Sequence, residues 1–208
     1  MRGWFFFDLG VSSMQLDKRR KGFSFSEEGP LDMRMDPSSS LTAMEIVNHW
    51  TEKQLGELFR LGEEPRWKRA ARAIVEERRK RVIKTTTQLA DTISSSLKTL
   101  LKGKLHPATL IFQALRMCVN HELEGITKGI TKAIQYLSSG GVMGVISFHS
   151  LEDRIVKHIF RQASDRSKSR VCEPVLHVMT KKPVVPTQKE MRINPRARSA
   201  KMRVVEKI

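Results

Sequence analysis

The chain has 208 residues and a formal net charge of +16, because 38 lysines and arginines outnumber 22 aspartates and glutamates. This length suits one domain, or one domain with an insertion, and is enough to bury a core. The cationic excess favours a polyanionic partner, either nucleic acid or an anionic membrane surface. No apolar run is long enough to span a bilayer, and the start lacks the cleavage site of a secretory signal. We therefore expect no membrane partner and favour nucleic acid.

The two cysteines, Cys118 and Cys172, stand far apart and form no CxxC pair. Neither a disulfide framework nor a structural zinc site is expected from this spacing. Cys118 lies in an apolar helical stretch and is predicted to be a buried thiol. This cysteine usage fits a reducing compartment.

The first predicted element is a strand, because Trp4 to Phe7 form a continuous apolar run that ends at Asp8. A short run of this kind predicts a strand buried on both faces, as in a parallel sheet. The polar segment 18–37 is predicted to be an ordered loop. Capping boxes predict helix starts, and apolar spacing predicts two helical segments. The boxes begin at Thr42, Thr51 and Thr85, and the segments cover 65–81 and 88–101.

The second half of the chain alternates between predicted helices and strands. A helical stretch opens at Pro107 and ends at Gly140-Gly141. The later elements are a buried strand over 142–148, a helix from Ser150 to about Arg161, and short strands over 175–179 and 200–205. This order predicts an α/β sheet that a helical block interrupts. The strands are too few for a complete sheet, so we expect its N-terminal half to be missing or supplied from elsewhere.

Asp8 is the first candidate functional residue, together with Gln15. Open α/β sheets bind ligands beyond the carboxyl ends of their strands, and Asp8 is expected at such an end. A carboxylate there can accept hydrogen bonds from an amine or a sugar hydroxyl. The alternative is that Asp8 only caps the following turn. The sequence has no GxGxxG motif and no P-loop, so this chain alone cannot complete a Rossmann-type cofactor site.

The segment Ser147-Phe-His-Ser-Leu-Glu-Asp-Arg154 is the second candidate, since it follows the second buried strand and opens a helix. Its end of the sheet would face the same crevice. Ser150 and Asp153 fit a capping box, a structural role that we favour over catalysis. His149 lacks the spacing of a metal site, and no metal is expected. A helix cap with a packed histidine and a catalytic histidine remain alternatives.

Two basic sets form the third candidate. One set crowds the helix over 65–81 and its exit, and contains Arg66, Lys68, Arg69, Arg72, Arg78, Arg79, Lys80, Arg81 and Lys84. The other crowds the tail and contains Arg192, Arg196, Arg198, Lys201 and Arg203. Cations that neutralise phosphates release counterions, and Trp67 could stack on a base. The alternative is a solvated charged face. At this net charge we favour phosphate contact, with Arg66, Lys68, Arg69, Arg72, Arg196, Arg198 and Lys201 as the candidate residues.

Long motifs also resemble the RsmH (MraW) family of small-subunit rRNA cytosine methyltransferases, from about Phe7 to the C-terminus. They are Asp8-Leu-Gly-Val-Ser-Ser-Met-Gln-Leu-Asp17, Gly22-Phe-Ser-Phe25, Gly29-Pro-Leu-Asp-Met-Arg-Met-Asp36, Gly62-Glu-Glu64, Ala73-Ile-Val75, Phe112-Gln-Ala-Leu-Arg116, Val119-Asn120, Glu122-Leu123, Ser147-Phe-His-Ser-Leu-Glu-Asp-Arg-Ile-Val-Lys157 and Asn194-Pro-Arg-Ala-Arg-Ser-Ala-Lys201. The resemblance implies an α/β, class I (Rossmann-like) methyltransferase fold with a helical insertion domain. Since the family's glycine-rich cofactor loop has no counterpart here, we expect an incomplete, N-terminally truncated fold. The expected division is 1–17, the end of the first methyltransferase half; 18–106, the insertion; and 107–208, the second half.

The resemblance further implies methyl transfer from S-adenosylmethionine to the N4 amine of a cytidine near the ribosomal decoding site. It assigns cofactor contacts to Asp8 and Gln15, while Ser12, Ser13 and His149 are candidates for a catalytic role. The implied partner is small-subunit rRNA or the assembled small subunit, and a homodimer is a further candidate assembly. A cytoplasmic location is expected, with a mitochondrion or chloroplast as the alternative. A catalytically inactive RNA-binding remnant is the competing interpretation.

Overall fold

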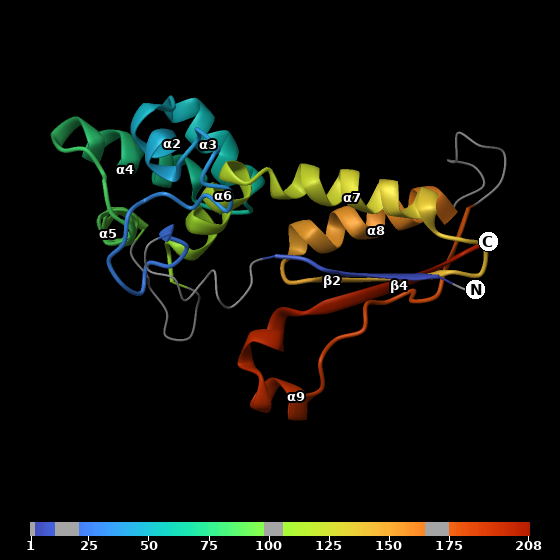
Figure 1. The fold of residues 1–208 in the computed structure, drawn as a ribbon. Coiled ribbons are helices and arrows are strands. Elements are labelled where there is room, and N and C mark those ends of the chain that lie inside the picture. The colour runs from blue at the N-terminus through green and yellow to red at the C-terminus, as the bar shows by residue number, and fades with distance from the viewer. Residues whose placement is uncertain (1–2, 11–20, 98–105, 165–174) are drawn as a thin grey trace. The chain divides into compact units, whose positions relative to one another are not determined.

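The computed structural model describes residues 3–10, 21–97, 106–164 and 175–208, and these form two compact units (Figure 1). The first, here called the sheet unit, comprises Met1–Gly10 and Glu122–Ile208. The second, the helical unit, comprises Val11–His121. Each unit has a hydrophobic core of its own. No helix among the described residues is both long and apolar enough to cross a membrane.

The described part of the helical unit contains a set of short helices. They are α2 (Ala43–His49), α3 (Glu52–Leu61), α4 (Trp67–Lys80), α5 (Thr86–Leu97) and α6 (Thr109–Val119). The predicted helix starts are confirmed. At Thr51 the side chain caps Gln54 N while Gln54 caps Thr51 N, which is a complete capping box. Thr85 and Gln88 exchange the same pair of hydrogen bonds at the start of α5.

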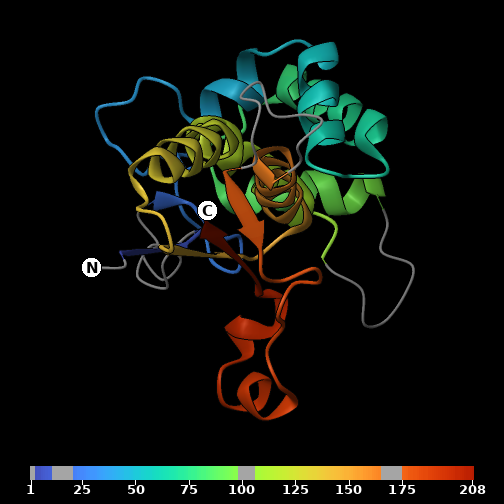
Figure 2. The same ribbon diagram turned by 90° about the vertical axis from the view of Figure 1, so that its right-hand side faces the viewer.

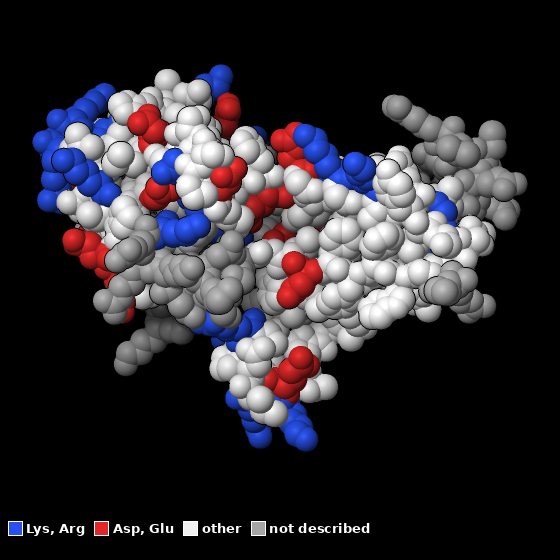
Figure 3. All heavy atoms as spheres, in the orientation of Figure 1, with Lys and Arg blue, Asp and Glu red and all other residues white. Residues whose placement is uncertain are grey.

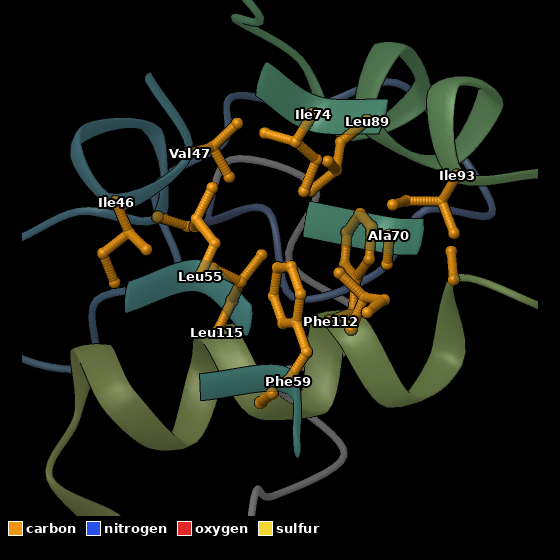
Figure 4. Packing of buried hydrophobic residues seen from close by; sticks show 14 of the residues in the cluster. Ile46, Val47, Leu55, Phe59, Ala70, Ile74, Leu89, Ile93, Phe112 and Leu115 are labelled. Carbon is orange, nitrogen blue, oxygen red and sulfur yellow. The ribbon is translucent and has the colours of Figure 1, made fainter. Parts of the chain in front are cut away.

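The core of the helical unit takes apolar side chains from all five helices (Figure 4). Ile46, Leu55, Ile74, Ile93 and Leu115 represent α2 to α6 in turn, and each is fully buried. Their helices present apolar residues three or four positions apart, so each helix has one face that must be covered. The interior therefore arises from patterns that are local to each helix.

The predicted ordered loop 18–37 is ordered from Lys21 onward, the part that the structure describes. Gly22 has φ +69°, and a Cβ there would lie 1.9 Å from the Pro30 carbonyl oxygen, so only glycine fits. Met33 also has a positive φ of 64°, and it is fully buried. The Asp32 carboxylate forms a bidentate pair with Arg34, at 2.8 Å to both Nε and Nη2. These contacts fix a segment without regular secondary structure.

Among its described residues, the sheet unit forms a four-stranded sheet in the order β1-β2-β4-β3. Its strands are β1 (Trp4–Asp8), β2 (Val142–Ser147), β3 (Leu176–Val178) and β4 (Lys201–Lys207). β1 and β2 are parallel, whereas β2–β4 and β4–β3 are antiparallel. Two long helices, α7 (Glu122–Tyr136) and α8 (Ser150–Ser164), cover one face (Figures 1 and 2). The short helix α9 (Gln188–Ile193) and the 3-10 helix η2 (Pro195–Ser199) lie on the other side in both views.

The prediction that the first strand is buried on both faces was wrong. Trp4 is 75% exposed and Phe6 is 54% exposed, although Phe7 packs into the core beneath α7 and α8. Side chains alternate across a strand, so only one face of β1 meets the helices. In the part of the chain that the structure describes, β1 pairs with β2 alone and is an edge strand.

The prediction of one helical stretch from Pro107 to Gly140 was also wrong. The chain breaks between α6 and α7, where His121 has φ +50°. The Asn120 side chain at this break binds the loop described above, donating to Met33 O at 2.8 Å and accepting from Met35 N at 2.7 Å. A tertiary contact therefore fixes this helix end, which apolar spacing did not reveal.

Candidate active site at the ends of β1 and β2

The carboxyl ends of β1 and β2 lie side by side, because the two strands are parallel and in register. Asp8 pairs with Ile146, and Leu9 N donates to Ile146 O at 3.0 Å. Asp8 is thus adjacent to the segment that runs from Ser147 into α8. The structure brings together two of the segments that the sequence marked as candidates.

Glu152 is the central buried group at this edge, and its residue has no exposed surface. One carboxylate oxygen, Oε2, accepts from the backbone N–H of Phe148 at 2.7 Å and of His149 at 3.4 Å. A Cβ on Gly10 would lie 3.7 Å from the other oxygen, Oε1. The carboxylate therefore occupies the start of α8 and faces the turn after β1. A negative charge is favourable there, since the first N–H groups of a helix lack intrahelical partners.

His149 faces the same carboxylate. Its Nδ1 accepts from Glu152 N at 3.4 Å, and its Nε2 lies 3.1 Å from Glu152 Oε1. The ring N–H does not point directly at that oxygen, so the approach falls short of a linear hydrogen bond. The pair reproduces a capping box in which a histidine replaces the usual serine or threonine. This geometry favours a capping role for His149 over a catalytic one.

Asp153 does not take the role that the sequence predicted for it. Its carboxylate binds the Arg203 guanidinium on β4, at 2.6 Å and 3.1 Å. Lys201 lies 4.0 Å from the same carboxylate. The capping function falls instead to Glu152, one residue earlier. Sequence reasoning could not distinguish Glu152 from Asp153 as the cap, because either carboxylate could reach the first N–H groups of α8.

Glu122 is a residue that sequence reasoning missed. It begins α7, and its carboxylate, His149 and Glu152 offer ligand atoms that all lie within 4.8 Å of one another. One imidazole and two carboxylates form a donor set that divalent transition metals accept. Because Glu122 lies far from His149 in the sequence, no short motif could indicate that the two side chains lie close together.

The other predicted site residues of this edge divide into two groups. Asp8 is exposed at the last position of β1, so its carboxylate is open to a ligand. Ser12, Ser13 and Gln15 lie outside the described residues. Asp8 is thus the one predicted cofactor contact whose position the structure gives.

The predicted basic set on α4 lies on the helical unit, where Figure 3 shows lysine and arginine side chains gathered. Lys68, Arg69 and Arg72 are exposed, and Lys68 Nζ lies 5.1 Å above the Trp67 ring. Arg66 is partly engaged within the unit, because its Nη1 donates to Leu97 O at 2.7 Å. Arg79, Lys80, Arg81 and Lys84 are exposed as well, so most members of this set can meet a phosphate.

Arg78, which crowds the same helix, serves the fold. Its Nη1 donates to Val47 O at 2.9 Å and to Trp50 O at 2.6 Å, and burial lowers its pKa. In the tail, Arg196 and Arg198 are both exposed on η2, and the Asn194 side chain caps this turn by accepting from the backbone N–H of Arg196 at 3.2 Å. A count of cations therefore overstates the number that can bind phosphate.

The class of protein follows from the sheet and this edge. A parallel strand pair within a mixed α/β sheet, with helices on one face, is compatible with a Rossmann-like methyltransferase fold. A model of the MraW methylase family matches residues 3–208. The chain belongs to the MraW methylase family.

Relatives of this chain include several bacterial proteins named ribosomal RNA small subunit methyltransferase H. The one from Synechocystis sp. is 52% identical over 203 residues, which cover 97% of this chain and 62% of the relative. Those from Protochlamydia amoebophila and Pelobacter propionicus are each 50% identical, covering 93% and 98% of this chain and 65% and 68% of the relatives. The chain therefore spans less than two thirds of the length of the first two.

Proposed function

We propose that the chain belongs to an S-adenosylmethionine-dependent enzyme that methylates the N4 amine of a cytidine in small-subunit rRNA near the decoding site. The observation that carries this proposal is the parallel pairing of β1 with β2, which places Asp8 beside the start of α8. Open α/β sheets bind their ligands at this edge. Membership of the MraW methylase family and the names of the relatives support methyl transfer to rRNA. A cytoplasmic location accompanies this function.

The proposed fold is an incomplete class I methyltransferase sheet with residues 18–106 as a helical insertion. The exposed Trp4 and Phe6 support the incomplete sheet, because aromatic side chains on a strand normally meet a covering layer. The helical unit has a hydrophobic core of its own, which supports a helical insertion, and this core also takes Ile111, Phe112 and Leu115 of α6, beyond residue 106.

Asp8 and Gln15 are the residues proposed to hold the cofactor. S-adenosylmethionine supplies, when bound, a methyl group on a positively charged sulfur. The exposed Asp8 carboxylate can accept hydrogen bonds from an amine or a ribose hydroxyl and offset positive charge. The glycine that follows, Gly10, has φ +91°, so the chain turns away directly after β1.

The target amine needs help from the protein because its lone pair is delocalised into the cytosine ring. Hydrogen-bond acceptors that hold the amine in line with the methyl carbon would raise its reactivity by positioning. Ser12 and Ser13 follow Asp8 closely in the chain and are proposed for this role. The base must be unpaired or flipped out to reach them.

His149 is proposed to be a positioning residue in this scheme. Both of its ring nitrogens face Glu152, at 3.4 Å and 3.1 Å, so the ring fixes the start of α8. That start forms the wall beside Asp8 and Gly10. The pair would therefore hold the shape of the edge while other groups contact the reactants.

The test measures cofactor binding and methyl transfer separately. Calorimetry of the purified chain with S-adenosylmethionine tests the part of the cofactor site that Asp8 and Gln15 form. It should give heat that Asp8→Ala removes and that Asp91→Ala, on the exposed side of α5, leaves unchanged. Incubation with isolated, unmethylated small ribosomal subunits should yield N4-methylcytidine, detected by mass spectrometry of the digested rRNA. Heat without any methylated cytidine would contradict the proposed substrate.

The second candidate is a catalytically inactive RNA-binding chain. The observation that favours it is the group of exposed cations on α4, among them Lys68, Arg69 and Arg72, which can meet phosphates. This candidate predicts no heat with S-adenosylmethionine and RNA binding that weakens steeply with salt. The same calorimetry therefore separates the two candidates.

A further inference from the structure

A pocket of about 360 Å³ lies within the sheet unit, and its lining includes neither Asp8 nor Glu152. α8 provides one wall, and the strands β3 and β4 with the residues after β3 provide the other. The lining residues are Lys157, Phe160, Arg161, Val178, Thr180, Lys181 and Arg203. This volume falls in the range of small-molecule sites, which begins at about 300 Å³.

The rim of the pocket is cationic. Four of its lining residues are lysine or arginine, and none is acidic. Arg203 is neutralised by Asp153 at 2.6 Å, but Lys157, Arg161 and Lys181 are exposed and form no ion pair among the described residues. Lys157 and Arg161 stand four positions apart on α8 and therefore share one helix face. Such a rim attracts an anion.

The floor of the pocket is apolar and fixed. Phe160 is 2% exposed and belongs to the core of the sheet unit, while Val178 packs against that core. The Thr180 hydroxyl is held by β4, since it accepts from Val204 N at 2.9 Å. An apolar floor beneath a cationic rim fits a ligand with a flat hydrophobic part and an attached anion.

We infer that this pocket binds one unpaired nucleotide of single-stranded RNA. The base lies against Phe160 and Val178, and the adjoining phosphates contact Lys157, Arg161 and Lys181. Contact of bases with apolar or aromatic side chains and of phosphates with cations is the common mode of single-strand binding. The inference rests on the RNA partner of the proposed function, and it adds a binding site separate from the proposed reaction edge.

The test measures binding of a fluorescein-labelled, unstructured RNA hexamer by fluorescence anisotropy, without S-adenosylmethionine. The background variant carries Lys68→Ala, Arg69→Ala and Arg72→Ala, so that these three exposed cations in the first half of α4 do not contribute. The pocket variant adds Lys157→Ala with Lys181→Ala. The matched control instead adds Lys128→Ala with Lys132→Ala, which removes the same charge from exposed positions on α7.

We expect the pocket variant to bind the hexamer about tenfold more weakly than the control variant. The slope of log affinity against log salt concentration should become shallower by about 0.7 for each phosphate that the variant no longer neutralises. Val178→Phe, which fills the pocket without changing charge, should weaken binding about tenfold and leave the salt dependence unchanged. Equal binding by pocket and control variants, unchanged binding by Val178→Phe, or loss of all binding in the background variant would each overturn the inference.

Two further measurements complete the test. The first asks whether a free nucleotide is the ligand, and the second uses the unmutated chain, so it does not depend on whether a variant folds. Cytidine 5′-monophosphate should displace the hexamer only at millimolar concentration; displacement at micromolar concentration would overturn the RNA assignment. Hexamers with 4-thiouridine should crosslink the unmutated chain at residues 157–161 or 178–181, and crosslinks confined to other segments would overturn it. Since no readout uses methyl transfer, the inference can hold even where the proposed activity fails.

Discussion

The carboxylate of Glu152 accepts a hydrogen bond from the backbone N–H of Phe148 at 2.7 Å, which ties the end of β2 to the start of α8. Glu152→Gln can keep its one amide oxygen on these N–H groups, but the amide NH2 then takes the place of Oε1, 3.1 Å from His149 Nε2. We expect the free energy of unfolding to fall by about 2 kcal/mol, because a buried donor then lacks its partner. Urea unfolding followed by circular dichroism measures this change.

The control for this substitution is Glu124→Gln on α7, where the carboxylate pairs with Lys128 at 2.7 Å on an exposed surface. An exposed pair of this kind contributes at most about 1 kcal/mol, so the control should change stability far less than Glu152→Gln. Equal losses in the two variants would show that the carboxylate does not hold the strand to the helix.

Local features of this fold could be predicted from the sequence. The capping boxes at Thr51 and Thr85 involve residues three positions apart, so four consecutive residues determine the hydrogen bonds that start α3 and α5. The apolar runs at Trp4–Phe7 and Val142–Phe148 likewise predicted the two parallel strands. Their parallel pairing then explains why Asp8 and the Ser147 segment, far apart in sequence, share one edge.

Features that depend on distant partners could not be predicted. The exposure of Trp4 and Phe6 is decided by what covers the sheet, and their own apolar character does not indicate this. Asp153 binds Arg203 because β4 lies against α8, and that neighbour is set by sheet order. Glu122 reaches the start of α8 only because α7 and α8 pack together. In each case the deciding contact joins segments with no shared local pattern.

Asn120 should be a strong determinant of the helical unit. Its side chain donates to Met33 O and Arg116 O, at 2.8 Å and 2.9 Å, and accepts from Met35 N at 2.7 Å. Asn120→Ala should lower the free energy of unfolding by about 2–3 kcal/mol, because buried backbone groups lose their partners. Asn120→Asp keeps the acceptor but turns a carboxylate toward two carbonyl oxygens, so it should destabilise at neutral pH at least as much.

Urea unfolding of both Asn120 variants at pH 7 tests this expectation. Asn48→Ala is a useful comparison, since its side chain also joins distant segments, through Ile83 N and O. Stability of Asn120→Asp equal to that of the unmutated chain would rule out the donor role of the amide.

Asp32 should make stability depend on pH in the acidic range. The side-chain hydrogen bond from Arg34 lowers the pKa of Asp32 below its ordinary 3.8 in the folded chain. A lowered folded pKa stabilises the fold above the unfolded pKa, and this contribution is lost as pH falls through the folded pKa. Asp32→Asn should therefore cost about 1 kcal/mol at pH 7, and the cost should shrink below about pH 4.

Urea unfolding of Asp32→Asn and of the unmutated chain at pH 7, 5, 4 and 3 measures this difference. Asp91→Asn, an exposed position on α5, controls for the loss of one negative charge. A difference between Asp32→Asn and the unmutated chain that stays constant from pH 7 to pH 3 would contradict the lowered pKa.

Cys118 should react slowly with thiol reagents. Desolvation by burial raises the pKa of its thiol above the ordinary 9.0, and the side chain packs against the core of the helical unit. The thiolate is the reactive form, so at pH 8 a smaller fraction of Cys118 is reactive than of an exposed thiol. In a Cys172→Ser variant, the rate with 5,5′-dithiobis(2-nitrobenzoate) should be about tenfold below that of glutathione. The rate should rise to the glutathione value in 6–8 M urea at about the same pH, because unfolding restores solvent to the sulfur. The predicted buried thiol is in fact half-buried, and a folded-state rate equal to that of glutathione would contradict its packing against the core of the helical unit.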